Sequence, residues 1–202
     1  MWWLLIIIII LALFIILFLL YFYRDPERII PKGDNIVVPA DGRIISIIDT
    51  SKKTIKINKG LLGKIKTLTK DVAKQCYVIS IFMSPFDVHI NRAPIGGIVK
   101  SIKYTRGKFF EAYNLEKSLQ NEKNEIIIKN KNIKVKVIQI AGLLARRIRC
   151  CIKKNQKINK GEKIGIIALS SQTTIIVPKG VDLRVKVNDK VKAGSTIIAY
   201  LR

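Results

Sequence analysis

Two stretches of the sequence carry an acid and a base of the kinds that move protons. Asp41 lies in the run Val-Pro-Ala-Asp-Gly, where its carboxylate could orient a base or simply close a tight turn in water. His89, the single histidine of the chain, lies in Ser-Pro-Phe-Asp-Val-His-Ile-Asn-Arg. A lone histidine is more often structural, but general acid–base chemistry near neutral pH would fall to this one.

Two further stretches carry cations and hydroxyls. Arg146 and Arg147 follow a Gly142 turn, and paired guanidiniums suit a phosphate or a carboxylate, or else a solvated strand end. Ser170 and Ser171 follow an apolar run, so one hydroxyl could be a nucleophile or both could be strand-end polarity. Neither serine lies in a Gly-x-Ser-x-Gly elbow, which argues against a hydrolase of that type.

The small numbers of histidine and cysteine exclude several classes of site. One histidine rules out a multi-histidine metal site within one chain and a zinc finger of the Cys2His2 type, so no metal is expected. Three cysteines, two of them adjacent, do not form a disulfide framework. Unpaired thiols agree with a reducing compartment.

The elements that must position these residues are expected to be short strands, because β-branched runs alternate with Gly, Asn and Pro from residue 36 onward. We expect an all-β or β-rich single domain, barrel-sandwich-like, with few short helices. Leu61–Val72 is ambiguous, and Pro85–Ile90 could form a short turn of helix. The expected strands are Ile36–Pro39, Ile44–Ile48, Lys53–Ile57, Tyr77–Met83, Gly97–Tyr104, Glu125–Ile128, Ile133–Ala141, Ala145–Lys153, Lys163–Ala168, Thr173–Val177 and Thr196–Leu201.

One internal repeat supports the sandwich. The stretch Asn155–Gly161 parallels Asn188–Gly194 at an offset of 33, each a polar turn, a hydrophobe and a glycine before a strand. Strand–turn–strand units of this kind recur in the sandwich folds of biotinyl and lipoyl carriers. A duplicated sandwich and two coincidental turns are both consistent with the pattern.

A membrane anchor precedes this domain. Residues 1–23 carry no charge, and about 20 apolar residues span a bilayer as a helix. Trp2, Trp3, Tyr21 and Tyr23 stand where interfacial aromatic residues are found. No basic segment or small-residue cleavage site marks a signal peptide. Since the basic residues all follow the helix, the positive-inside rule places residues 24–202 in the cytoplasm, at the cell membrane.

The net charge of +23 fits more than one partner. A basic surface beside a bilayer attracts anionic headgroups, whereas the same charge on a free domain could attract nucleic acid. Lysines solvated on strand faces are an equally good explanation. No nucleic-acid recognition module accompanies the charge, so the membrane surface is the expected partner.

Taken together and in this order, the blocks resemble phosphatidylserine decarboxylase in its short, archaeal-type, single-domain form. The resemblance covers nearly the whole chain. It runs through Phe22–Arg28 after the anchor, Pro39–Gly42, Phe82–Pro94, Gly107–Phe109, Asn121–Asn124, Gln139–Arg147, Gly161–Gly165 and the final turn at Asn188–Gly194.

This resemblance implies a proenzyme that makes its own cofactor. In the family, a serine hydroxyl attacks the preceding carbonyl, the resulting ester breaks by β-elimination, and the new N-terminus becomes a pyruvoyl group. That ketone forms a Schiff base with the serine headgroup and accepts the electrons released as CO2 leaves. The expected reaction converts phosphatidylserine to phosphatidylethanolamine in phospholipid biosynthesis; the sequence does not distinguish related lipids with other chains.

The family roles carry over to matching positions here. Ser171 is the expected pyruvoyl precursor, so cleavage at Ser170–Ser171 would divide the chain into residues 1–170 and 171–202, which stay together as a heterodimer. Asp41 matches the acid that orients the base, and His89 matches the base that takes the Ser171 proton. Candidate contacts for the lipid phosphate or carboxylate are Arg92, Arg146 and Arg147. Homo-oligomers of the heterodimer could also form.

Two departures from the family pattern bear on maturation. Ser170 replaces the usual glycine, which costs backbone freedom before the scissile bond and supplies a second hydroxyl. Gln172 replaces the usual Arg or Thr, so a family role at that position is in doubt. A poorly processed or inactive family member is therefore one alternative, and a membrane-anchored, lipoyl-like adaptor is another.

Overall fold

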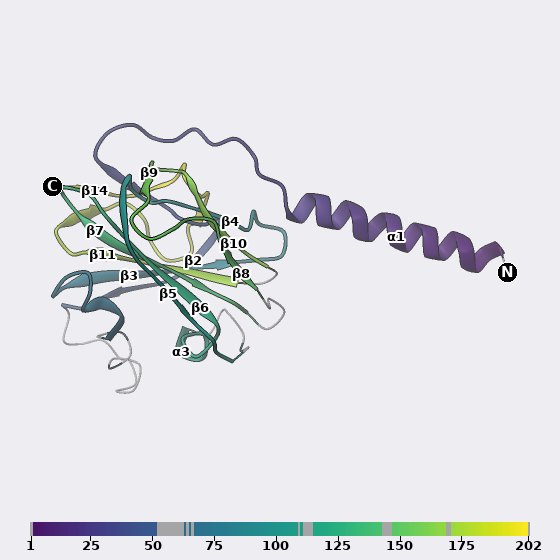
Figure 1. Cartoon of the computed structure of the whole chain (residues 1–202), viewed down its shortest axis with the longest axis horizontal. Coiled ribbons are helices and arrows are strands. Elements are labelled where there is room, and N and C mark those ends of the chain that lie inside the picture. Colours follow the sequence, from purple (N-terminus) through teal and green to yellow (C-terminus); the bar gives the residue numbers. More distant parts are fainter. Residues whose placement is uncertain are drawn as a thin grey trace.

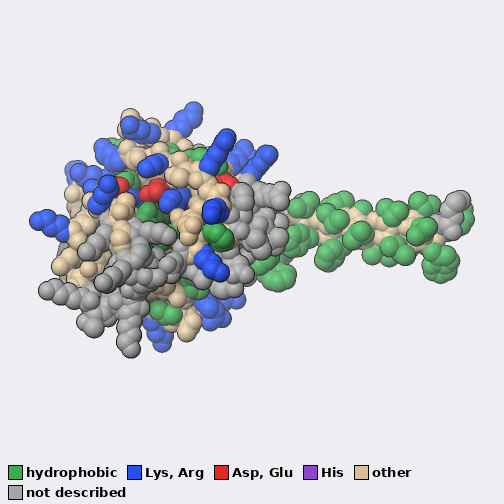
Figure 2. All heavy atoms as spheres, turned by 90° about the horizontal axis from the view of Figure 1, so that it is seen from below, with side chains coloured by type: hydrophobic (Ala, Val, Ile, Leu, Met, Phe, Trp, Pro, Cys, Tyr) green, Lys and Arg blue, Asp and Glu red, His purple; other side chains and the backbone are tan. Residues whose placement is uncertain are grey.

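The computed structural model describes residues 2–51, 63, 65, 67–108, 110, 115–142, 147–168 and 171–201. A long helix, α1 (Trp2–Phe22), projects from a β-rich body (Figure 1). Its 21 residues rise about 31 Å, the thickness of a bilayer core. Hydrophobic side chains cover the helix, whereas Lys and Arg are scattered over the face of the body seen in Figure 2. The helix is long and apolar enough to cross a membrane.

The body is built on one eight-stranded antiparallel sheet. Its central strand pairs along its length with β3 on one side and with β7 on the other. That strand is β11, and it begins at Ser171. The strands, in spatial order, are β13 (Lys190–Val191), β2 (Gly42–Asp49), β3 (Cys76–Met83), β11 (Ser171–Pro178), β7 (Lys134–Ile140), β6 (Lys123–Lys129), β5 (Gly97–Thr105) and β9 (Lys157–Ile158).

Two three-stranded antiparallel sheets complete the body. One has the order β1 (Asn35–Val37), β14 (Ile197–Leu201), β12 (Val181–Leu183). The other has the order β4 (Ile90–Arg92), β10 (Lys163–Ile167), β8 (Ile148–Cys150). None of the three sheets closes into a barrel. The prediction of a β-rich, barrel-sandwich-like body behind an N-terminal apolar helix is confirmed.

Each face of β11 meets a different core, because side chains alternate along a strand. Ile175 and Val177 enter the larger core, which also holds side chains from both small sheets. Ile176 enters a smaller core with Leu119, which follows the short helix α3 (Leu115–Ser118), and with Ile65 and Leu68, both helical residues. Ser171 has the same parity as Ile175, so it faces the larger core.

Most predicted strands are present within one to three residues of their expected bounds. The predicted strand Lys53–Ile57 lies outside the described residues, and the ambiguous Leu61–Val72 includes helical residues where it is described. The segment Pro85–Ile90, which the sequence allowed to form a short turn of helix, forms one turn and no helix. The Asp87 amide bonds the Ser84 carbonyl to close a single turn, and the Asp87 carboxylate accepts from the Ser84 amide and hydroxyl, so the chain extends into β4.

The two repeated turns adopt the same backbone conformation. Each begins with an asparagine of positive φ, Asn155 at 67° and Asn188 at 77°. Each ends with a glycine of positive φ, Gly161 at 82° and Gly194 at 76°. A Cβ atom on either glycine would lie within 3.0 Å of the Ile30 side chain. The duplicated strand–turn–strand pattern is therefore a structural repeat, and both copies close on the segment that follows the anchor.

Candidate active site

Ser171 opens β11 in a fully buried position. Its Cα pairs with that of Met83 on β3, and its hydroxyl lies 3.5 Å from the Met83 sulfur. A thioether is a weak acceptor, so this contact places the hydroxyl but does not hold its proton strongly. Ser170, on the other side of the expected scissile bond, lies outside the described residues.

His89 is fully buried and its ring has a defined tautomer. Nδ1 lies 2.9 Å from the carbonyl oxygen of Asp87. A carbonyl only accepts, so Nδ1 carries the proton and Nε2 presents its lone pair. Nε2 is buried without a hydrogen-bond partner among the described residues. Burial lowers the pKa of His89 from 6.5 to about 4, so the imidazole is a neutral, unoccupied base at pH 7.

Asp41 is bound by other groups than the histidine. Its carboxylate pairs with the Arg28 guanidinium at 2.8 Å and accepts the Ala193 amide at 2.7 Å. No hydrogen bond joins Asp41 to His89 in the described part of the chain. The orienting role that the sequence predicts for Asp41 is performed in this structure by the backbone carbonyl of Asp87.

A buried polar network surrounds the Ser171 hydroxyl. The Met83 sulfur also receives the Thr173 hydroxyl at 3.5 Å and faces the Asn91 amide at 3.8 Å. The Asn91 oxygen accepts from Gln139 at 2.8 Å. These hydrogen bonds fix the side chains in one conformation, because breaking any of them would leave a buried polar group without a partner.

The same network relates the histidine to the serine. Asn91 and His89 are both fully buried and two residues apart in an extended segment, so they point to the same side. The His89 carbonyl accepts the Ile167 amide at 3.3 Å, four residues before Ser171. The structure thus gathers Ser171 and His89 at the ends of β3, β4, β10 and β11.

The three arginines suggested for substrate binding differ in how they are held. Arg92 is engaged by Asp25 and by the Gly161 carbonyl, which leaves little of its guanidinium for a ligand. Arg147 is exposed, and its carbonyl accepts the Ala168 amide at 3.3 Å, three residues before Ser171. Arg146 lies outside the described residues.

Gln172 faces away from the site. It is buried on the opposite face of β11, where its Oε1 accepts from the Ser118 hydroxyl at 3.1 Å and its Nε2 donates to Thr174 at 2.9 Å. Its contacts join α3 to the central strand. These two hydrogen bonds satisfy both polar atoms of the buried glutamine side chain.

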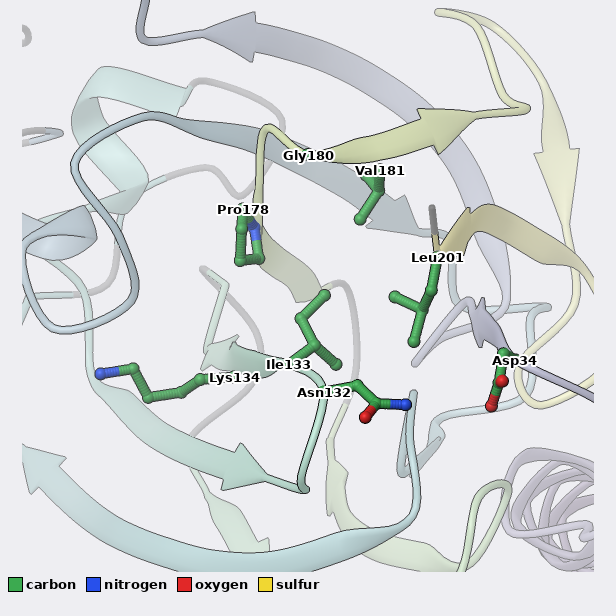
Figure 3. Close-up of a pocket in the computed structure, with 8 residues that line it drawn as sticks. All are labelled: Asp34, Asn132, Ile133, Lys134, Pro178, Gly180, Val181 and Leu201. Carbon is green, nitrogen blue, oxygen red and sulfur yellow. The ribbon is translucent and has the colours of Figure 1, made fainter.

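Two of the pockets on the body are lined by described residues. The larger, of about 350 Å³, is lined by Ile133, Pro178, Val181 and Leu201, and the Lys134 side chain points away from that apolar group (Figure 3). The smaller, of about 270 Å³, is lined by Ser84 and Asp87 of the turn before His89 and by Arg43 and Lys190. The smaller pocket is the one beside the site, and it carries two cations. The described residues contain no cluster of three or more potential metal-binding His, Cys, Asp or Glu side chains.

Sequence reasoning missed the residues that hold the site together. Met83, Asn91 and Gln139 lie inside the quoted blocks, but nothing in the spacing shows that they share one network. Thr173 has the parity of Ser171, which could have placed it on the same face. Phe22, whose ring lies 4.2 Å from that of His89, gave no signal, because it ends an unbroken apolar run.

Comparison with known proteins agrees with this geometry. The family model for phosphatidylserine decarboxylase matches residues 15–199. The putative archaetidylserine decarboxylase proenzyme of Methanocaldococcus jannaschii is 45% identical over 183 residues, 90% of this chain and 89% of that protein. Phosphatidylserine decarboxylase proenzymes of Desulfotalea psychrophila and of Wolbachia sp. subsp. Brugia malayi are 38% and 42% identical over 90% of this chain, and 78% and 74% of theirs. The resemblance in the sequence blocks is confirmed, and the chain belongs to the phosphatidylserine decarboxylase family.

Proposed function

We propose that this chain is a proenzyme that cuts itself before Ser171 and then removes CO2 from the serine headgroup of a phospholipid. The observation that carries the proposal is that His89 Nε2 is buried without a hydrogen-bond partner among the described residues, in the same region of the body where β11 begins with the buried Ser171. A neutral base and a hydroxyl that can give it a proton are the groups that serinolysis needs.

In the proposed cut, His89 Nε2 takes the Ser171 hydroxyl proton while Oγ attacks the Ser170 carbonyl carbon. The C–N peptide bond breaks, the Ser171 nitrogen takes a proton, and an ester replaces the amide. Loss of the Ser171 α-proton then expels the Ser170 carboxylate and leaves a dehydroalanine at residue 171. Its imine tautomer takes up water and releases ammonia, which makes a pyruvoyl terminus.

The residues around Ser171 fit such a terminus. A pyruvoyl ketone has no charge, and the site around Ser171 supplies Thr173, Asn91 and a thioether rather than a charged pair. When formed, the ketone supplies an electron sink for decarboxylation. His89 would then hold a proton at Nε2 for the carbanion, with Nδ1 still fixed by the Asp87 carbonyl. Burial of the site favours loss of a charged carboxylate as neutral CO2.

We propose that the two cleavage products, residues 1–170 and 171–202, remain bound to each other. Residues 1–23 form the membrane anchor, and residues 24–202, from both products, form the catalytic domain. Residues 171–202 contribute β11, β12, β13 and β14, and each of these pairs with strands of residues 1–170 or with one another. The pairing of β11 between β3 and β7 supports a heterodimer that survives the cut.

We further propose that α1 anchors the body on the cytoplasmic face of the cell membrane. The basic surface would face anionic headgroups, and the anchor would hold the site at the level of its lipid substrate. Arg147 and the Arg43–Lys190 pocket are the exposed cations beside the site that support a lipid phosphate contact. The relatives' names mention both phosphatidylserine and archaetidylserine, so the shared serine headgroup is the proposed substrate feature.

Intact-mass analysis of the purified full chain tests this function. We expect fragments 1–170 and 171–202, with the second blocked to N-terminal sequencing and trapped by borohydride. Ser171→Ala should stay uncut, and Ser170→Ala should still be cut. Vesicles of phosphatidylserine and of a diether serine lipid then identify the substrate. One uncut species without CO2 release from either vesicle would mean an inactive family member, and a reversed pair of variants would move the cut by one residue.

A further inference from the structure

Phe22, the last residue of the membrane helix α1, is buried, unlike the rest of the helix. Most α1 side chains are exposed, Phe14 at 66% for example, whereas Phe22 is 2% exposed. The Phe22 ring lies over the His89 imidazole with the centroids 4.2 Å apart and the planes 35° apart. The anchor therefore ends as part of the wall around the candidate base.

Polar contacts hold the end of α1 in this place. The Phe86 carbonyl accepts from the Tyr21 hydroxyl at 3.2 Å and from the Arg24 guanidinium at 2.7 Å. Arg24 also bonds the Tyr21 carbonyl and lies 3.7 Å from the centre of the Tyr21 ring. Phe86 belongs to the turn that leads to His89, so the helix end and the histidine are fixed to the same piece of backbone.

We propose that Phe22 is a positioning residue for His89, so that docking of the membrane anchor completes the site. The Phe22 ring covers one face of the imidazole, keeps water from Nε2, and holds the ring in the plane set by its bond to the Asp87 carbonyl. The catalytic use of His89 rests on the proposed function, but its contact with the anchor does not.

The groups around His89 determine in which direction its pKa shifts when Phe22 is removed. The charged groups that act on the ring are the Asp87 carboxylate, which favours the imidazolium, and Arg24 from the anchor end, which disfavours it. Burial is the largest influence, and it lowers the pKa of His89 to about 4. Phe22 supplies part of that burial, so its loss admits water and raises the pKa toward 6.5.

His89 can be titrated directly, because it is the only histidine in the chain. We suggest following its ring carbon and proton signals by NMR between pH 3.5 and 8 in bilayer nanodiscs. The protein is the full chain, with a histidine-free tag and with Ser171→Ala to keep it uncut. Added to this background, Phe22→Ala is expected to raise the pKa of His89 by about one unit or more, and Phe22→Leu, which keeps an apolar cover, by less.

Phe14→Ala is the matched control, since it removes the same ring from the lipid-exposed part of the same helix. It is expected to leave the titration unchanged. An unaltered pKa in Phe22→Ala, or equal shifts in Phe22→Ala and Phe14→Ala, would overturn the inference. Should Phe22→Ala fail to fold, the comparison of Phe22→Leu with Phe14→Leu decides the question. Phe22→Leu is then expected to raise the pKa of His89, and Phe14→Leu to leave it unchanged.

Maturation provides the second readout. In the cleavable chain, self-cleavage of Phe22→Ala is expected to fall between pH 8 and pH 5.5 by the factor that its NMR-measured pKa dictates, reaching about tenfold where that pKa is 6.5, because the protonated imidazole cannot take the hydroxyl proton. The wild type should lose little over that range. A purely structural effect would lower the rate by the same factor at both pH values. A wild type that never cuts would instead overturn the proposed function and leave the NMR result standing.

Discussion

Replacing Asp41 by Asn separates two roles for this carboxylate. The sequence assigns it to His89, whereas the structure pairs it with Arg28, the two side chains being 11% and 9% exposed. Asparagine keeps an acceptor for the Ala193 amide and removes the charge opposite the guanidinium. An unpaired buried charge costs about 3 kcal/mol or more. For a chain of this size, the melting temperature should fall by about 6–12 °C.

The assay combines thermal unfolding with maturation. Unfolding is followed in detergent on the uncut Ser171→Ala chain, so that one polypeptide melts. Asp41→Asn and Arg28→Met should each lower the melting temperature, and the double variant should recover much of the loss, because no charge is then left alone. In the cleavable chain, Asp41→Asn and Arg28→Met should slow maturation to a similar extent.

A different pattern would refute this reasoning. If Asp41→Asn stops self-cleavage while its melting temperature stays at the wild-type value, and Arg28→Met cleaves normally, then Asp41 acts on the base and the ion pair is incidental. A double variant as unstable as the sum of the single variants would also contradict the ion-pair account, since coupled groups are not additive.

Three further results are expected. Because the pKa of His89 is lowered to about 4 in the folded chain, the unfolded chain binds its proton more tightly, so stability is complete above pH 6.5 and declines as pH falls toward 4. The loss amounts to about 3 kcal/mol, which urea unfolding can measure and which His89→Phe should remove. Gly42→Ala should lower the free energy of unfolding by roughly 3 kcal/mol or more, because φ is 141° and the new Cβ would lie 2.1 Å from the Phe82 carbonyl oxygen. Gly180→Ala is the control: it has open space around it and should match the wild type in the same unfolding assay. Arg147→Ala should raise KM for serine lipid vesicles with kcat and maturation unchanged; an unchanged KM would remove this arginine from the substrate site.

The sequence contained most of what was needed to place Ser171. The run of β-branched residues from Thr173 to Val177 predicts a strand, and the structure starts that strand at Ser171. The prediction began two residues late because Ser171 and Gln172 are neither β-branched nor apolar. Here the Ser171 and Thr173 hydroxyls enter the core on the Met83 sulfur, which no local pattern can show.

The expected acid could not be placed from sequence for a related reason. Asp41 and His89 are 48 positions apart, and the motif that carries each says nothing about which partner it meets. Arg28 reaches Asp41 only because the segment after the anchor runs across both repeated turns, with Ile30 against Gly161 and Gly194. That path is a tertiary property. The carbonyl of Asp87, which fixes the tautomer of His89, is a backbone group and is invisible to any reading of side-chain types.

The position of the proposed cut also explains how a chain could break within its own core and remain folded. A cut before Ser171 falls at the very start of β11, so the ladders with β3 and β7 begin after it and lose no pair. The new terminus would stay in the larger core beside Asn91 and Thr173, since Ile175 and Val177 anchor the same face of the strand. A cut two or more residues later would instead divide the central strand. The register of β11 therefore favours Ser171 over any later hydroxyl, Thr173 and Thr174 included, as the residue that can become a reactive terminus without unfolding the sheet.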